Sequence, residues 1–417
     1  MDRTLVVVGA SLAGLRAVEA VRGDGWTGPV VLIGAEEHLP YDRPPLSKGY
    51  LSAAECPDPT YRDEDRLTRE LGVELVLGTP ASALDLDART VTVGERDVGY
   101  DALVLATGSY ARTLPGTDGL AGVFTVRTLD DARLLRGALR AGSPKVTVVG
   151  GGFIGSELAS AGRALGLDVT MVERGPTLLA SAVGPSAGQA LTRLHERHGT
   201  RVLTGVRVEE VLGDRRVRAV RLSDGSEIET DILIAGIGAV PATAWLEGSG
   251  LSLDDGVLAD ATLAAAPHVH VAGDLARWPN PLFDDVLDGP MRLQHWTTAA
   301  EQGARAARNA VDPAGARPFE TVPYFWSDWY ASRIQFAGIP TAGDHEVHVE
   351  LVAGDHADGG PFTALYRAND RLIGALALDM RAEVMKYRRL IAQRADWETA
   401  AELARTRREK AAERTST

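Results

Sequence analysis

The stretch VTVVGGGFIGSELASAGRAL, from Val146 to Leu165, decides the fold. A short run of β-branched residues leads into glycines and then into an alanine-rich segment with helical periodicity, which predicts a strand, a tight turn and a helix. Its glycines Gly150, Gly152 and Gly155 have the G-x-G-x-x-G spacing of a dinucleotide-binding turn. A second apolar strand follows and ends in Glu173, where an acid would hold a ribose hydroxyl. The segment therefore predicts a strand-helix-strand unit that binds a dinucleotide.

The same pattern opens the chain about 140 residues earlier. The strand residues 5–8 run into Gly9 and Gly14, and a second apolar strand is followed by Glu36. Ser11 stands where the middle glycine is expected, and its hydroxyl could itself donate to a phosphate. Two dinucleotide sites in one chain predict two redox cofactors, a flavin and a nicotinamide.

The rest of the chain predicts an α/β fold with an added C-terminal domain. Alternating stretches at 89–98 and 217–230 indicate antiparallel meanders, and each leads into a buried strand, 102–108 and 231–238. After about residue 323 alternating strands are followed by two charged helices, which is typical of a separate α+β domain.

Composition excludes several classes of protein. The 417 residues include 44 Lys and Arg against 57 Asp and Glu, a net charge of −13, which argues against nucleic acid as the main partner. The longest uncharged apolar stretch, 232–246, is broken by glycine and proline, so no membrane span is expected. The chain enters a strand directly after Met1-Asp2-Arg3, which leaves no signal peptide and makes the cytoplasm the expected location.

Sulfur and metal chemistry are also not expected. Cys56 is the single cysteine, so a two-cysteine redox centre within one chain is impossible. It lies between Glu55 and Pro57 in a loop-like sequence, where a bystander thiol is expected. The nine histidines show no metal-ligand spacing, and no metal site is predicted.

Six segments together resemble the FAD-dependent ferredoxin reductases that supply bacterial Rieske dioxygenases and haem-thiolate monooxygenases, within the pyridine nucleotide-disulfide oxidoreductase superfamily. The matching segments are Pro40-Tyr-Asp-Arg-Pro-Pro-Leu-Ser-Lys48, Ala106-Thr-Gly108, Gly150-Gly-Gly-Phe-Ile-Gly-Ser-Glu157, Ala235-Gly-Ile-Gly238, Ala272-Gly-Asp274 and Tyr324-Phe-Trp-Ser-Asp328. The resemblance implies two Rossmann-like domains as in glutathione reductase, plus an α+β C-terminal domain. The implied boundaries are 1–112 and 241–322 for an FAD domain, 113–240 for an NAD domain and 323–417 for a C-terminal reductase domain.

The resemblance also implies which residues bind the two cofactors. Those implied for FAD are Gly9, Ser11, Ala13, Gly14, Ala35, Glu36, Arg43, Lys48, Ala81, Ala106, Thr107, Gly108, Arg127, Asp274 and Trp296. Those implied for NADH are Gly150, Gly152, Phe153, Ile154, Gly155, Glu157, Glu173, Gly236, Ile237 and Gly238.

At Ala35 the sequence departs from the family pattern, and at Asp274 two roles are possible. The family usually carries an aspartate where Ala35 stands, so the FAD ribose contact is expected on Glu36 or on the local backbone. Asp274 follows an apolar strand, and either a ribityl contact or a helix cap would suit it.

The resemblance makes Lys48 and Glu157 a catalytic pair, placed by the isoalloxazine edge and the nicotinamide. We expect Glu157 in the first turn of its helix, where the helix dipole favours a carboxylate. Without the resemblance, the alternatives are an ordinary surface or capping carboxylate for Glu157 and a solvated cation for Lys48.

The resemblance also implies that electrons leave towards an iron–sulfur ferredoxin. The resemblance places Trp326 towards this acceptor, within an aromatic cluster that could also be interface core. Arg305, Arg308 and Lys386 are candidate docking cations, because local basic charge would steer an acidic ferredoxin. A rubredoxin reductase, a flavin-dependent peroxidase and an NADH-sensing flavoprotein that acts through a protein partner remain alternatives.

Overall fold

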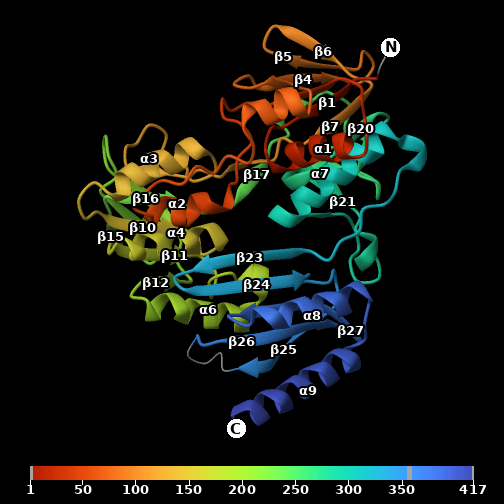
Figure 1. Cartoon of the computed structure of the whole chain (residues 1–417). Helices are drawn as coiled ribbons and strands as arrows, with labels where there is room; N and C mark the ends of the chain where they lie inside the picture. The colour runs from red at the N-terminus through yellow and green to blue at the C-terminus, as the bar shows by residue number, and fades with distance from the viewer. Residues whose placement is uncertain (1–2, 355–358, 416–417) are drawn as a thin grey trace. The chain divides into compact units, whose positions relative to one another are not determined.

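The computed structural model describes residues 3–354 and 359–415, which fold into two compact units (Figure 1). Each unit is assembled from three separate stretches of chain. The first comprises Met1–Asp42, Asp58–Tyr110 and Val240–Pro323, and the second comprises Arg43–Pro57, Ala111–Ala239 and Tyr324–Thr417.

The first unit is built on a six-stranded sheet in the order β19-β20-β7-β1-β2-β3. All neighbouring strands are parallel except the pair β19-β20. The strands are β1 (Leu5–Val8), β2 (Val30–Ile33), β3 (Val73–Val76), β7 (Ala102–Leu105), β19 (Ala264–Ala266) and β20 (Val269–Val271).

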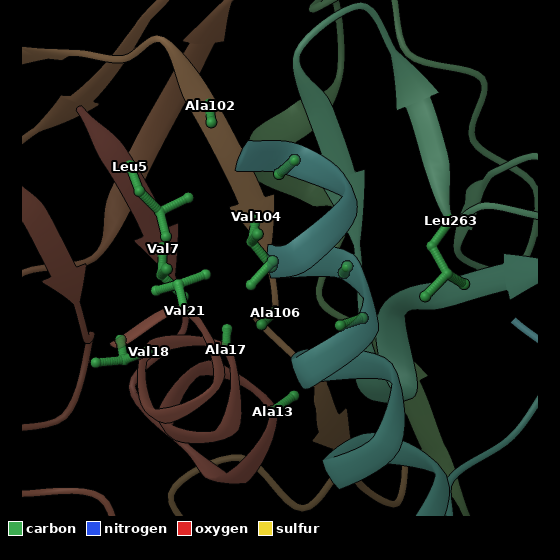
Figure 2. Close-up of a cluster of buried hydrophobic side chains, with 14 of the residues drawn as sticks. Leu5, Val7, Ala13, Ala17, Val18, Val21, Ala102, Val104, Ala106 and Leu263 are labelled. Carbon is green, nitrogen blue, oxygen red and sulfur yellow. The ribbon is translucent and has the colours of Figure 1, made fainter. Parts of the chain in front are cut away.

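Both faces of this sheet are buried, as expected for parallel strands. Successive residues of β1 alternate between two cores: Leu5 and Val7 pack on one face, and Val6 and Val8 pack on the other. Figure 2 shows the first of these faces, where α1 (Leu12–Gly23) and α7 (Trp296–Val311) cover the sheet.

Helices α1 and α7 approach each other very closely at Gly303. A Cβ atom there would lie 2.1 Å from the carbonyl oxygen of Ala13, so only glycine fits at this crossing.

Smaller sheets complete the first unit. The antiparallel meander predicted at 89–98 is confirmed as β5 and β6, with β4 as a third strand. The strands of these sheets are β4 (Ala81–Asp85), β5 (Thr90–Val93), β6 (Arg96–Gly99), β18 (Val257–Leu258), β21 (Ala276–Trp278) and β22 (Met291–Arg292). Two further short strands, β8 (Ser109–Ala111) and β17 (Ala239–Pro241), include residues of both units.

The second unit contains a five-stranded sheet in the order β12-β11-β10-β16-β9, all parallel. Its strands are β9 (Val123–Phe124), β10 (Lys145–Val149), β11 (Asp168–Glu173), β12 (Arg201–Thr204) and β16 (Ile232–Ala235). Its helices are α2 (Gly49–Ser52), α3 (Leu129–Leu139), α4 (Phe153–Ala164), α5 (Ala180–Val183) and α6 (Pro185–Arg197). The meander predicted at 217–230 is confirmed within the sheet of β13 (Val208–Leu212), β14 (Ala219–Leu222) and β15 (Glu227–Glu229).

The C-terminal stretch of the second unit is α+β, as predicted. An antiparallel sheet in the order β23-β24-β27-β26-β25 is followed by two helices, with α8 against β24 and β27 (Figure 1). The elements are β23 (Tyr324–Trp329), β24 (Ser332–Gly338), β25 (Val347–Gly354), β26 (Phe362–Ala368), β27 (Arg371–Leu378), α8 (Arg381–Ala392) and α9 (Trp397–Thr415).

Candidate functional site

The two glycine turns have matching geometry in the two units. In the first, Gly9 has φ +122°, and a Cβ atom there would lie 2.1 Å from the carbonyl oxygen of Ala106. In the second, Gly150 has φ +101°, and its Cβ would lie 2.3 Å from the carbonyl oxygen of Gly236. Both positions therefore require glycine, because each combines a left-handed backbone with a close backbone contact.

The third glycine of each turn packs the helix onto the turn itself. A Cβ at Gly14 would lie 1.9 Å from the oxygen of Gly9, and a Cβ at Gly155 would lie 2.0 Å from the oxygen of Gly150. The middle position is different, since a Cβ at Gly152 would meet nothing closer than 4.0 Å. This open space explains why the first turn can carry Ser11 without distortion.

The helices that follow both turns begin without a capping side chain. The N-cap residue is Ser11 for α1 and Gly152 for α4, and neither makes a side-chain hydrogen bond that caps its helix. Neither helix has an acidic residue in its first turn. Helix α3, by contrast, has a full capping box between Thr128 and Asp131. Uncapped N–H groups above a glycine turn are suited to a pyrophosphate, so both turns fit a dinucleotide.

An acid follows the second strand of each unit. The carboxylate of Glu36 accepts a 2.5 Å hydrogen bond from the hydroxyl of Tyr41, and the neighbouring Ala35 is exposed. Glu173 accepts the N–H groups of Gly151 and Gly175, each at 2.6 Å and each on a different oxygen. The carboxylate of Glu173 is thus fixed beside the glycine turn by two backbone N–H groups.

The start of α7 brings further predicted FAD residues together in the first unit. Asp274 accepts a 2.8 Å hydrogen bond from the Ser109 hydroxyl, and Gly273 donates its N–H to the buried Gln302. The indole of Trp296 donates to Asp42 and to the Tyr61 hydroxyl, both at 2.9 Å.

Buried polar atoms remain along the same face of α7. Among the described residues, neither Thr298 Oγ1 nor Gln302 Nε2 has a hydrogen-bond partner, although both side chains are almost fully buried. Unsatisfied buried groups are rare and are expected where a ligand supplies the missing partner. The residues around Asp274 therefore also fit a bound cofactor.

Lys48 and Glu157 form a buried ion pair in the second unit, with 2.9 Å between Nζ and Oε1. Lys48 is 19% exposed and Glu157 only 3%. The Ser47 hydroxyl donates to Oε2 at 2.5 Å, and the Ser327 hydroxyl donates to Oε1. The carboxylate is therefore surrounded by donors on both oxygens.

The predicted place of Glu157 in the first helical turn is wrong. Helix α4 begins at Phe153, so Glu157 is its fifth residue, and the first turn carries no acid. The ion pair and the two hydroxyls hold this carboxylate instead of the helix dipole.

The segment that carries Lys48 is anchored to α3. It forms a 3-10 helix, Pro44–Ser47, and then the short helix α2. The guanidinium of Arg136 donates to the carbonyl oxygens of Tyr50, Leu51, Ala53 and Ala54, and Arg140 donates to those of Leu51, Ser52 and Ala53. Arg43 similarly donates to the carbonyl oxygen of Arg127 at 2.5 Å.

The remaining predicted cofactor residues lie close to the two turns or at strand ends. Thr107 donates its hydroxyl to Ala242, and Ala81 begins β4. Phe153 and Ile154 are the first two residues of α4, and Ile154 is 44% exposed. Gly236, Ile237 and Gly238 follow β16, as Ala106, Thr107 and Gly108 follow β7.

Family comparison supports the interpretation of these turns. Residues 3–303 match the family described as pyridine nucleotide-disulphide oxidoreductase, and residues 324–408 match the family described as reductase C-terminal. This chain is a pyridine nucleotide-disulphide oxidoreductase. The expectation of FAD and NAD(H) as its cofactors is confirmed by that membership.

Proteins with similar sequences and structures match nearly the whole length of this oxidoreductase. It is 33% identical over 395 residues to a probable ferredoxin reductase, CtmF, of Castellaniella defragrans, with 94% of each chain covered. It is 35% identical to the ferredoxin–NAD(+) reductase component of an anthranilate 1,2-dioxygenase system of Burkholderia cepacia, with 93% of each covered. The crystal structure of the ferredoxin reductase for the CYP199A2 system from Rhodopseudomonas palustris has a TM-score of 0.87 and 30% identity, covering 95% of this chain and 96% of that one. The predicted fold class and family are confirmed.

Cys56, the single cysteine of this oxidoreductase, lies apart from both turns in sequence, and its side chain is exposed. Among residues 3–354 and 359–415, no three or more His, Cys, Asp or Glu side chains are grouped to hold a metal ion. Within the same residues, no helix is both long enough and apolar enough to cross a membrane.

The predicted docking residues occur in both units of the oxidoreductase. Trp326 stacks on Tyr324 with 6.2 Å between ring centroids, and Arg388 lies 5.4 Å above the Tyr324 ring. Lys386 lies 3.7 Å from Glu383.

The two predicted cations of the first unit are on α7. Arg308 is exposed and forms an ion pair with Asp24 at 2.6 Å, while Arg305 is half-buried. Much of the Arg308 charge is therefore offset locally, which weakens its case as a docking cation.

The aromatic cluster of 324–330 divides into two groups. Trp329 is fully buried against the ring of His195, and the Tyr330 ring stacks on His198. Burial lowers the pKa of His195 to about 3 and raises that of Tyr330 to about 12, so both side chains are neutral near pH 7. Trp329 is structural core, as the alternative interpretation expected, whereas Tyr324, Trp326 and Tyr330 are only partly buried.

Sequence reasoning missed the polar partners of the predicted residues. Ser47, Ser109 and Ser327 each donate to a carboxylate predicted to face a cofactor. Ser47 and Ser327 lie within two of the matching segments, Pro40–Lys48 and Tyr324–Asp328, and that was the only signal for them.

Proposed function

We propose that this chain is an FAD-dependent reductase that takes electrons from NADH and passes them singly to a [2Fe-2S]-type ferredoxin serving a monooxygenase or dioxygenase. One observation carries the proposal: two matched, uncapped dinucleotide turns occur in a chain whose only cysteine is exposed and lies outside both. Electrons that arrive from a nicotinamide must therefore leave without passing through a cysteine pair.

In this proposal the chain's own residues bind and orient the two cofactors. The turn Gly9–Gly14 and the N-terminus of α1 bind the FAD pyrophosphate, and Glu36 or the adjacent backbone binds the adenosine ribose. Asp274 holds the ribityl chain, and Trp296 lies near the flavin. The turn Gly150–Gly155 binds the NADH pyrophosphate, and Glu173 faces its ribose.

Lys48 and Glu157 act together in the proposed site. The pair carries no net charge, so it can border an uncharged ring without leaving an isolated buried ion. When bound, the flavin supplies the conversion between a two-electron hydride donor and a one-electron acceptor. Lys48 and Glu157 then orient the ring edge and the nicotinamide towards each other.

The proposal assigns the domains accordingly. Residues 1–112 and 241–322 form the FAD domain, 113–240 form the NAD domain, and 323–417 form the reductase domain that faces the ferredoxin. Trp326 with Lys386 and Arg305 contributes to docking, and Arg308 less so. We further propose a cytoplasmic location, with no nucleic acid or membrane as partner.

Two measurements test the proposal. Flavin released from the purified protein is separated by chromatography, and recovery of FMN without FAD would contradict two dinucleotide sites. Cytochrome c reduction by NADH is then measured with and without an added [2Fe-2S] ferredoxin. A strict requirement for ferredoxin supports the reductase, whereas slow turnover with a persistent charge-transfer band supports an NADH sensor instead.

A further inference from the structure

Strand β23 and the residue that follows it, Tyr330, contact helix α4 at three points. The ring centroids of Phe325 and Phe153 lie 4.5 Å apart, the Ser327 hydroxyl donates to Glu157, and the Tyr330 N–H donates to Ser160 Oγ at 2.6 Å. The helix residues are spaced by four and three positions, so they lie on one face of α4. The strand is therefore fixed in register along the helix that carries Glu157.

The polarity of the hydrogen bonds at Ser327 is fixed by chemistry. The indole N–H of Trp329 lies 2.8 Å from Ser327 Oγ, and an indole nitrogen can only donate. Ser327 Oγ must accept that bond, so its single hydroxyl proton is directed to the Glu157 carboxylate. The chain of donors runs from Trp329 through Ser327 to Glu157.

Both donors are held rigidly. Ser327 and Trp329 are fully buried, and the Trp329 ring packs against His195 with 4.8 Å between centroids. The His195 Nδ1 and the Thr200 hydroxyl lie 2.7 and 2.9 Å from the Tyr330 hydroxyl, which fixes the end of the strand. The Ser327 hydroxyl consequently has one available orientation.

We propose that Ser327 is a positioning residue, oriented by Trp329, that holds Glu157 in place on Lys48 during hydride transfer. Ser327 and Lys48 donate to the same carboxylate oxygen, Oε1, while Ser47 donates to Oε2. Loss of Ser327 leaves Glu157 held only from the Lys48 side, so the carboxylate and its lysine can move together. The inference rests on the proposed function, because it assumes that this pair borders the flavin and the nicotinamide.

A strand of the reductase domain would then set geometry within the NADH-binding domain. Successive β-strand side chains point to opposite faces, so Trp326 and Ser327 project from β23 in opposite directions. The residue proposed to face the acceptor is thus next to the residue that positions the proposed catalytic pair.

The test uses the FAD-loaded full chain and anaerobic rapid mixing with NADH. We expect Ser327→Ala to lower the limiting rate constant of flavin reduction about tenfold, with the NADH dissociation constant changed by less than about twofold. Ser327→Thr keeps a hydroxyl and should restore most of the rate. Trp329→Phe should lower the rate in the same direction, and adding it to Ser327→Ala should cause no further loss, because both changes break one chain of donors.

A second readout does not depend on turnover. Without the Ser327 donor the negative charge of Glu157 is less fully offset, so the flavin midpoint potential of Ser327→Ala should become more negative. Ser332→Ala is the matched control, since it removes a serine hydroxyl from the paired strand β24 without any bond to Glu157. It should change neither the rate nor the potential.

The result that overturns the proposal is a Ser327→Ala protein with wild-type reduction rate and potential, or a Ser327→Thr protein as slow as Ser327→Ala. If Ser327→Ala fails to fold because the Trp329 indole loses its acceptor, the double variant with Trp329→Phe removes that orphaned donor, and a wild-type rate in it overturns the proposal equally. Failure of the proposed function looks different, because the wild-type protein itself would then either not be reduced by NADH or pass no electrons to an added ferredoxin.

Discussion

The crossing of α1 and α7 predicts that Gly303→Ala weakens the retention of FAD. A Cβ at position 303 would lie 2.1 Å from the carbonyl oxygen of Ala13, whereas carbon and carbonyl oxygen normally approach to no less than about 3.3 Å. The helices would have to separate by about 1 Å. Ala13 lies within the Gly9–Gly14 turn, so this movement displaces the proposed pyrophosphate site.

The expected size follows from two opposing effects. Overpacking a buried contact costs about 1–3 kcal/mol, and the higher helix propensity of alanine returns about 1 kcal/mol. The net cost is therefore up to about 2 kcal/mol. If the FAD-free protein relieves the clash by letting α1 move and FAD binding restores it, affinity for FAD falls by up to about 30-fold.

The assay compares the dissociation constant of FAD, from fluorescence titration of the flavin-free protein, for wild type and variant. Gly137→Ala is the matched control, because Gly137 is also helical, on α3, but a Cβ there meets nothing within 4 Å. The control should bind FAD as wild type does. Unchanged FAD affinity in Gly303→Ala would refute the reasoning, since it would show that the clash costs the same with and without FAD.

Four further predictions follow from the site. NADH should be preferred over NADPH by at least about tenfold in kcat/KM, because the fixed carboxylate of Glu173 would repel a 2′-phosphate; equal kcat/KM values would contradict this. Cys56→Ser should keep ferredoxin reduction within about tenfold of wild type, and a larger loss with FAD still bound would point to a peroxidase-like mechanism. Trp326→Ala and Lys386→Glu should lower ferredoxin turnover but spare ferricyanide reduction, with only the Lys386 effect fading at high salt; equal loss of both activities would mean that the residues are structural. The pKa of buried His195 is about 3 in the folded protein against about 6.5 when unfolded, so the unfolded state binds the extra proton and stability should fall by up to about 1.4 kcal/mol per pH unit below about pH 6.5. Thermal unfolding at about pH 5 and pH 7 tests this, and a His195→Asn protein should show a smaller difference.

Local patterns predicted the elements of this protein well. The two turns around Gly9 and Gly150 and the meanders were predictable because glycine spacing and alternation act over about ten residues. The start of α4 was predicted too late, since Glu157 was expected in its first turn although α4 begins at Phe153 and the packing role of the third glycine places Gly155 inside the helix. That error produced the wrong helix-dipole explanation for Glu157.

Long-range contacts between small polar residues were not predictable. Ser47 and Ser327 donate hydrogen bonds to Glu157 although they lie 110 and 170 positions away in the sequence. A single serine produces no periodic pattern from which such a contact could be predicted. The ion pair of Arg308 with Asp24, 284 positions earlier, was not predictable either, because no local pattern links two residues so far apart in sequence. Which charges are free at a surface depends on the tertiary structure.

The strand order of the first unit has a consequence for synthesis of the chain on the ribosome. Strand β7 pairs on one side with β1, which precedes it, but on the other with β20, which is made about 165 residues later. At about 5–20 residues per second, one edge of β7 stays open for about 10–30 s while the whole intervening segment is translated. An open, fully apolar strand edge invites pairing with other nascent chains, so growth temperature and chaperone supply should govern the yield of folded protein more than the codons of the last domain do.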